Sequence, residues 1–188
     1  MRTTLLTVFL LGATLSHPAE RAIEKEILVK AGVDAVWQAW TTKDGVKSFF
    51  APDGEVELRP DGPYEIYFNP YAEPGLKGGD GNRLMAFQEH KMLAFTWNAP
   101  PHLPEARKQR THVVVRFEPQ GERQTLVKLR HDGWGDGGEW DKAFDYFSKA
   151  WPQVLANLER RFSQGPVDWS EWLKQLPKKP ASYFPAQN

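Results

Sequence analysis

The segment Glu139–Phe162 constrains the fold of this 188-residue chain most, because its large apolar side chains share one helical face. They recur every three or four residues, at Trp140, Phe144, Phe147, Trp151, Val154, Leu155, Leu158 and Phe162. This spacing matches the 3.6-residue turn of an α-helix. About 24 residues rising 1.5 Å each give a helix of roughly 36 Å. We therefore predict a long helix whose aromatic face closes over a sheet and leaves a cavity between them.

Pro152 lies inside this predicted helix. A proline in a helix interior removes one backbone hydrogen bond and clashes with the carbonyl group four residues earlier, here that of Ser148. We predict a kink between these two residues. The kink would separate an N-terminal half that lines a pocket from a C-terminal half that packs on the sheet.

Most of the sequence before the helix is typical of β-strands. Alternating apolar and polar residues predict strands at 23–29, 55–58, 64–68, 83–89, 93–97, 111–118 and 124–131. Residues 34–40 and 41–50 are expected to form short helical segments. Residues 69–82 are rich in glycine and proline, so we expect a lid, a binding loop or a flexible insert there. A run of strands followed by a long helix predicts an α+β domain with an antiparallel sheet of about six or seven strands.

The composition argues against several classes of function. The 24 basic and 24 acidic residues balance, whereas nucleic-acid-binding proteins usually carry a basic excess, so we expect no nucleic-acid partner. The chain has no cysteine, which excludes disulfides, thiolate catalysis and cysteine-ligated zinc. The five histidines lack metal-binding spacing, and neither a dinucleotide fingerprint nor a Gly-x-Ser-x-Gly elbow is present. We expect no metal and no cofactor.

The first residues have the pattern of a secretory signal peptide. A basic Arg2 precedes an apolar run over residues 5–15. The run is shorter than the roughly 20 residues that span a bilayer, so we expect no stable membrane span. Small residues favour cleavage after Ser16, with cleavage after Ala19 as the alternative. We therefore predict that residues 1–16 are removed and that the protein is periplasmic or secreted; an uncleaved anchor or a misassigned start codon is the alternative interpretation.

Several landmarks together resemble one protein family. They are Trp37-x-x-Trp40-Thr41, Leu93-x-Phe95-Thr96-Trp97, the strand Val113–Phe117, Thr125-x-x-x-Leu129-x-His131-x-Gly133-Trp134 and Trp151-x-x-x-Leu155-x-x-Leu158. In this order the chain resembles the family named for the activator of the heat-shock protein 90 ATPase, within the START-like (SRPBCC) superfamily. The resemblance covers residues 21–162, which we take as one domain. Residues 163–188 are then a C-terminal extension.

The resemblance implies the helix-grip fold, in which a curved antiparallel sheet wraps around a long C-terminal helix with a cavity between them. It does not imply one activity, because members of the superfamily bind ligands, close rings enzymatically or regulate chaperones, and a fold does not fix a function. For an exported protein, contact with a cytosolic chaperone is physically implausible.

The expected cavity yields a set of candidate ligand-binding residues. They are the aromatic residues of the helix face and of the segments facing it, together with one histidine: Phe49, Phe50, Tyr64, Trp97, His131, Trp134, Trp140, Phe144 and Phe147. Core packing is the alternative for the aromatic rings. Strand alternation places His131 on the apolar side near the cavity mouth, where it would contact a ligand or instead cap the loop 133–138. His112 is expected on the opposite face.

Three functions are consistent with these features. We favour an exported domain that binds a small hydrophobic or amphipathic molecule, because no catalytic constellation is visible. The second is an enzyme of the cyclase or hydrolase type that uses His131 and Tyr64 as polar groups of an apolar pocket. The third is an interaction protein similar to a chaperone regulator, which uses Trp169 and Trp172 of the extension. The oligomeric state stays open.

Overall fold

Residues 20–177 are described by the computed structural model of this chain. The predicted signal peptide, its cleavage site and the end of the C-terminal extension lie outside the described residues. The fold therefore concerns the predicted domain and the first part of the extension.

Five antiparallel strands form the main sheet, in the order β1-β7-β6-β5-β4. Their bounds are Ile23–Val29 for β1, Thr125–Asp132 for β7, Thr111–Pro119 for β6, Met92–Trp97 for β5 and Leu84–Gln88 for β4. Two further strands, β2 (Asp53–Val56) and β3 (Tyr64–Tyr67), pair with each other as a separate antiparallel ribbon. The α+β class with a long C-terminal helix is confirmed, and the seven strands found in the described part of the chain divide between these two sheets.

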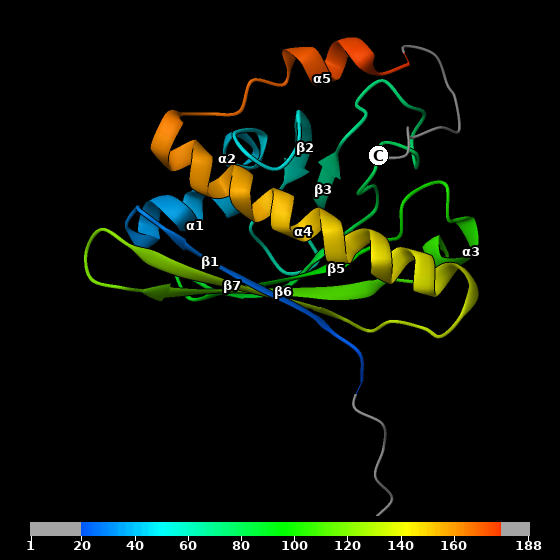
Figure 1. The fold of residues 1–188 in the computed structure, drawn as a ribbon, viewed down its shortest axis with the longest axis horizontal. Coiled ribbons are helices and arrows are strands. Elements are labelled where there is room, and N and C mark those ends of the chain that lie inside the picture. The colour runs from blue at the N-terminus through cyan, green and yellow to red at the C-terminus, as the bar shows by residue number, and fades with distance from the viewer. Residues whose placement is uncertain (1–19, 178–188) are drawn as a thin grey trace, which may run out of the picture.

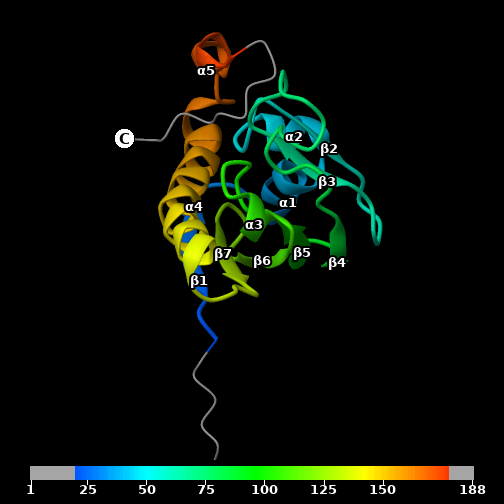
Figure 2. The same ribbon diagram turned by 90° about the vertical axis from the view of Figure 1, so that its right-hand side faces the viewer.

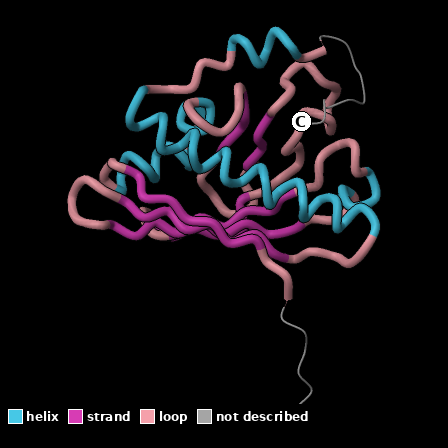
Figure 3. Tube along the Cα trace, viewed as in Figure 1, coloured by secondary structure: helices cyan, strands magenta, loops and turns pink. Residues whose placement is uncertain are grey.

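The helices lie on one face of the main sheet. Their bounds are Val33–Thr41 for α1, Lys43–Lys47 for α2, Pro104–Arg107 for α3, Gly138–Gln164 for α4 and Ser170–Gln175 for α5. Figure 1 shows α4 crossing the sheet, with α3 near the beginning of α4 and with α1 and α2 toward its end. Figure 2 shows α4 above the β1 side and the β2–β3 ribbon above the β4 side. In Figure 3, the opposite face of the sheet is free of helices over the described residues.

The long helix α4 contains the whole segment predicted from the apolar periodicity, and Pro152 lies inside it. It begins after Gly137, whose φ of 69° lies in the left-handed region that glycine tolerates. Phe147, Trp151 and Leu155 are buried against the sheet, whereas Phe144 is only partly buried. The C-terminal half of the helix therefore carries the tighter packing.

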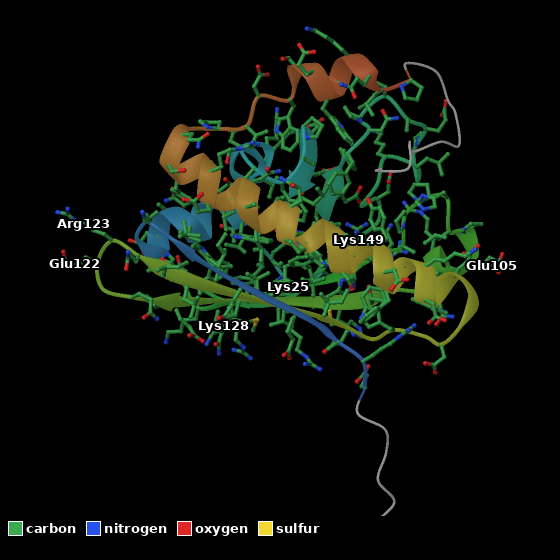
Figure 4. All side chains as sticks on the ribbon, in the orientation of Figure 1. Lys25, Glu105, Glu122, Arg123, Lys128 and Lys149 are labelled. Carbon is green, nitrogen blue, oxygen red and sulfur yellow. The ribbon has the colours of Figure 1, made fainter. Side chains whose placement is uncertain are left out.

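Strand register decides which side chains meet α4. In the paired strands β6 and β7, Val113 lies opposite His131 and Val115 opposite Leu129, and all four are buried. The residues between them face away, so that Lys128 points from the sheet away from α4 (Figure 4). Figure 4 also shows side chains filling the layer between α4 and the sheet. This layer is the hydrophobic core.

The first part of the C-terminal extension packs on the body of the same chain. The indole N–H of Trp169 donates to the carbonyl oxygen of Lys47 at 2.6 Å, and that of Trp172 donates to the carbonyl oxygen of Phe68 at 2.8 Å. Leu176 is buried as well. These contacts attach α5 beside α2 and the end of β3.

Candidate functional site

His131, at the end of β7, forms hydrogen bonds with side chains from two other elements. Trp151 of α4 donates its indole N–H to Nδ1 of His131 at 2.9 Å. Nε2 of His131 lies 2.7 Å from Oγ1 of Thr111, and that hydroxyl donates to the carbonyl oxygen of Trp97 at 3.1 Å. Because Nδ1 accepts, the neutral ring carries its proton on Nε2 and donates it to Thr111. Both ring nitrogens are thus satisfied.

The surroundings of His131 favour the uncharged imidazole. Its side chain is fully buried, and the ring lies 4.1 Å from the ring of Trp134 and 5.2 Å from that of Phe147 between centroids. Burial, with a smaller contribution from His112, lowers the pKa of His131 from 6.5 to about 3. The structure places this residue inside the core, not at a cavity mouth, and the loop after β7 is not capped by its ring. The exposed His112 lies on the outer face, as the alternation predicts.

Three of the candidate aromatic residues belong to one packed cluster. The ring of Phe50 stacks on that of Trp97 at 5.6 Å between centroids, and Tyr64 stacks on Phe95 at 4.3 Å. Phe49 packs edge-on against Trp40 at 5.1 Å. The hydroxyl of Tyr64 donates to the carbonyl oxygen of Trp40 at 2.9 Å. Phe49, Phe50 and Tyr64 therefore fill the interior of the domain.

Three other candidates lie on or just before the beginning of α4. Trp134 lies 5.3 Å from Phe144 between ring centroids and donates its indole N–H to the carbonyl oxygen of His131 at 3.0 Å. The guanidinium of Arg21 lies 5.0 Å from the centre of the Phe144 ring. Trp140 packs so closely on Gly135 that a side chain there would collide with its indole. Trp134, Trp140 and Phe144 thus close the end of the core.

Trp97 and Phe147 line a small crevice between α4 and two loops. Its lining residues are Phe68, Gly78, Trp97, Asn98, Pro100, Pro101, Tyr146 and Phe147. The cavity volume is about 20 Å³, which is room for about one water molecule. The indole nitrogen of Trp97 is buried and has no hydrogen-bond partner among the described residues. Trp97 therefore combines an apolar ring that lines the crevice with a buried indole N–H that has no partner among the described residues.

A larger cleft of about 420 Å³ lies beside the crevice, between β3, the loop 69–82 and α3. Its lining residues are Glu65, Tyr67, Pro74, Gly75, Lys77, Asp80, Gly81, Asn98, Arg107 and Arg110. None of these belongs to the set of candidate residues chosen from the sequence. The glycine-rich composition of the loop was the available signal, because such loops often bind ligands.

Asp80 organises the wall of this cleft. Its carboxylate accepts hydrogen bonds from the backbone N–H groups of Gly75 at 2.8 Å and Gly78 at 2.9 Å. Arg107 of α3 lies 3.4 Å from the same carboxylate and donates to the carbonyl oxygens of Gly75 and Ala99. The loop is thereby folded back onto α3.

Asn98 connects the cleft with the crevice, because it lines both. Its amide nitrogen donates to the carbonyl oxygen of Asp80 at 3.0 Å, and its amide oxygen accepts from Asn82 at 3.3 Å. The amide oxygen of Asn82 is buried without a hydrogen-bond partner in the described part of the chain. Two polar atoms of residues next to Asn98 are therefore unused, the amide oxygen of Asn82 and the indole N–H of Trp97.

The charges of the cleft come from three cations and two carboxylates. Burial lowers the pKa of both Arg107 and Arg110, whereas the carboxylate of Asp80 acts to raise the pKa of each. Burial and a hydrogen bond of 2.7 Å to Glu65 raise the pKa of Tyr67 above its ordinary value. Lys77 lies 4.8 Å from the centre of the Tyr67 ring.

The outer face of the main sheet carries a third hollow of about 610 Å³. Its lining residues Lys128 and Arg130 form ion pairs, with Lys128 2.7 Å from Glu118 and Arg130 2.7 Å from Asp132. Lys25 and Lys128 mark this region in Figure 4. Because these charges pair with one another, the hollow has the character of a solvated sheet surface.

Residues 20–177 contain neither a membrane-spanning helix nor a cluster of metal ligands. No described helix is both long enough and apolar enough to span a membrane. Within the same residues, no three histidine, aspartate or glutamate side chains come together as metal ligands.

Comparisons with known proteins agree with this architecture. The sequence model of the family described as Activator of Hsp90 ATPase homolog 1-like protein matches residues 30–163. A search of curated proteins found no match. Solved structures are similar at low identity, which shows the shared fold alone.

Three of these structures illustrate the similarity. A protein from Mesorhizobium loti has a TM-score of 0.61 and 18% identity, covering 78% of this chain and 100% of its own. The Aha1 dimer from Colwellia psychrerythraea has a TM-score of 0.58 and 22% identity, covering 77% and 98%. An AHSA1-like protein from Rhizobium etli has a TM-score of 0.57 and 18% identity, covering 81% and 89%.

Proposed function

This chain belongs to the family of Activator of Hsp90 ATPase homolog 1-like proteins, and from this premise we propose that it binds a small amphipathic molecule. The fold supports a ligand-binding or regulator domain. We place the ligand at Asn98, where the cleft beside α3 meets the aromatic crevice.

The observation that carries this proposal is the junction at Asn98. The cleft volume of about 420 Å³ lies within the usual range of ligand pockets, yet its walls are polar and charged. The adjoining crevice is lined by Phe68, Trp97 and Phe147, and the buried indole N–H of Trp97 is unused among the described residues. A ligand with a polar group and an apolar end suits both walls. The crevice holds about one water as it stands, so an apolar end would widen it on binding.

The interior between α4 and the sheet gives less support to the enzyme hypothesis. His131 binds Trp151 and Thr111, whereas the Tyr64 hydroxyl binds the Trp40 carbonyl group. The two polar groups expected to act on a substrate thus have separate partners in the core. The interaction hypothesis also loses support, because the indole N–H groups of Trp169 and Trp172 donate hydrogen bonds within the same chain.

We also propose that the protein acts after export. The basic residue and apolar run at the N-terminus support this, as does the lack of cysteine, which is compatible with an oxidising compartment. N-terminal sequencing of the protein recovered from the periplasm or medium tests it. The expected first residue is His17, or Glu20 with the alternative cleavage site. Recovery only in the cytoplasm with Met1 intact would contradict export.

Binding itself can be tested on the protein comprising residues 17–188. Decanoate and 1-decanol, each below its aggregation limit, are titrated while native mass spectrometry and tryptophan fluorescence are recorded. We expect saturable binding with one molecule per chain. The absence of both a mass adduct and a saturable fluorescence change with either probe would contradict the proposed function.

A further inference from the structure

We propose that the polar group of the ligand is a carboxylate, and that Arg110 and Lys77 bind it in the cleft. This inference rests on the proposed function and adds the chemical class of the ligand to it. It depends on which charged groups of the cleft are already engaged and which remain free to meet a ligand.

Both carboxylates of the cleft have partners. Asp80 is largely buried, with 12% of its side chain exposed, and it accepts from two backbone N–H groups besides facing Arg107. Glu65 accepts the hydroxyl hydrogen of Tyr67 at 2.7 Å. These groups act as structural acceptors, so a cationic ligand would have to compete for them.

Arg107 is engaged as well. It faces Asp80 and donates to the carbonyl oxygens of Gly75 and Ala99, which holds the loop against α3. Only 13% of its side chain is exposed. A guanidinium with this many contacts positions the cleft wall and has few donors left for a ligand.

Arg110 and Lys77 are different. Arg110 contacts backbone carbonyl oxygens alone, that of Arg107 at 3.1 Å and that of Asp80 at 3.5 Å. Neither Arg110 nor Lys77 forms an ion pair within 4 Å with any residue in the range 20–177. Both line the same cleft. Two cations without an ion-pair partner within 4 Å thus line one space of ligand size, and the carboxylates of Asp80 and Glu65 act on Arg110 from a longer distance.

The charge balance selects the kind of anion. Among the lining residues, three cations against two carboxylates leave one positive charge in excess, and Glu55, which lies opposite Glu65, adds a negative charge outside the lining. A carboxylate neutralises this charge, and its two oxygens match the planar fork of a guanidinium. A phosphate monoester carries a charge of about −1.5 to −2, so Glu65 and Asp80 repel it more strongly than they repel a carboxylate with a single charge. The cleft therefore suits a carboxylate better.

Gly81 makes room for the guanidinium of Arg110. A Cβ atom at this position would lie 3.1 Å from a terminal nitrogen of Arg110, and the φ of 69° also favours glycine. A side chain here would press on the group that we assign to the ligand. The position of Gly81 therefore links the loop conformation to the anion site.

The test compares three probes with the same chain, decanoate, 1-decanol and decyl phosphate, at neutral pH by isothermal titration calorimetry. The variants are Arg110→Gln and, as a matched control, Arg116→Gln, which removes an exposed arginine from the outer face of the sheet. We expect the unchanged protein to bind decanoate at least about tenfold more tightly than decanol. Arg110→Gln should remove that difference while decanol binding persists, and Arg116→Gln should change neither.

The outcomes separate the two proposals. Equal binding of decanoate and decanol, unaffected by Arg110→Gln, would overturn the carboxylate site and leave the proposed function standing. No binding of any probe to the unchanged protein would overturn both. Tighter binding of decyl phosphate than of decanoate would overturn the proposal of a carboxylate and indicate a phosphate site instead. Retained decanol binding and an unchanged circular dichroism spectrum show that the Arg110→Gln variant is folded.

Discussion

The indole N–H of Trp151 on α4 donates a hydrogen bond of 2.9 Å to Nδ1 of His131 on β7. Both side chains are buried, so this bond joins the long helix to the sheet inside the apolar core. It also fixes the imidazole as an acceptor at Nδ1, which leaves Nε2 to donate to Thr111. His131, a candidate ligand-binding residue in the sequence, thus serves to attach α4 to the sheet.

Replacing this histidine should destabilise the fold. In the His131→Ala variant, the indole N–H of Trp151 loses its acceptor, the hydroxyl oxygen of Thr111 loses a donor, and a cavity remains. We expect the free energy of unfolding to fall by about 3 kcal/mol, measured by urea denaturation. His112→Ala, on the exposed face, is the control and should change it by less than about 0.5 kcal/mol. Equal effects of the two substitutions would contradict the role of His131.

The lowered pKa of His131 predicts a pH dependence of stability. The folded state holds this histidine neutral down to about pH 3, whereas the unfolded chain binds a proton near 6.5. The contribution of His131 is therefore complete above pH 6.5 and is lost as the pH falls toward about 3. The loss approaches about 1.4 kcal/mol per pH unit within this window.

The pH effect is measured as a difference between two proteins, because carboxylates also titrate at low pH. Denaturation of the unchanged protein and of a His131→Asn variant is followed from pH 7 to pH 4. The stability difference between them should shrink as the pH falls. A difference that stays constant over this range would show that His131 keeps an ordinary pKa in the folded state.

Asp80 is expected to hold the loop 69–82 closed. The Asp80→Asn variant loses the buried ion pair with Arg107 and weakens the acceptor for two backbone N–H groups. We expect faster cleavage within this loop in limited proteolysis and a loss of about 1–3 kcal/mol of stability. Glu105→Gln breaks an exposed pair with Lys108 and should leave both quantities nearly unchanged. A cleavage rate in Asp80→Asn equal to that of the control would count against this role.

The C-terminal extension should stabilise the chain that carries it. In the Trp172→Phe variant, the carbonyl oxygen of Phe68 loses its indole donor while the apolar contact is largely kept. We expect a loss of about 1 kcal/mol in the free energy of unfolding and an unchanged mass by light scattering. A changed oligomeric state with unchanged stability would instead indicate that the extension binds a partner.

Several features of the fold could be predicted from the sequence. The 3.6-residue period of Trp151, Leu155 and Leu158 identified α4, and strand alternation placed His131 inside and His112 outside. These predictions succeeded because periodicity records which face of an element is buried. The resemblance to a known family, carried by short motifs in a fixed order, supplied the overall architecture.

The site could not be predicted in the same way. Glu65, Asp80 and Arg110 meet in one cleft although they belong to a strand, a loop and the segment after α3, and no periodicity relates them. Likewise, the hydrogen bond between Trp151 and His131 depends on how α4 lies on the sheet. Aromatic residues such as Phe50 and Tyr64 have the same sequence pattern whether they line a cavity or fill it, and here they fill it.

The most direct test of an amphipathic ligand at the Asn98 junction is a nitrogen-15 nuclear magnetic resonance titration with decanoate. Trp97 and Trp40 both have buried indole N–H groups without hydrogen-bond partners in the described structure, but only Trp97 is among the residues lining the crevice. We predict that the indole resonance of Trp97 shifts progressively until saturation while that of Trp40 stays in place. A Trp97 resonance that does not move at saturating decanoate would contradict binding at this junction.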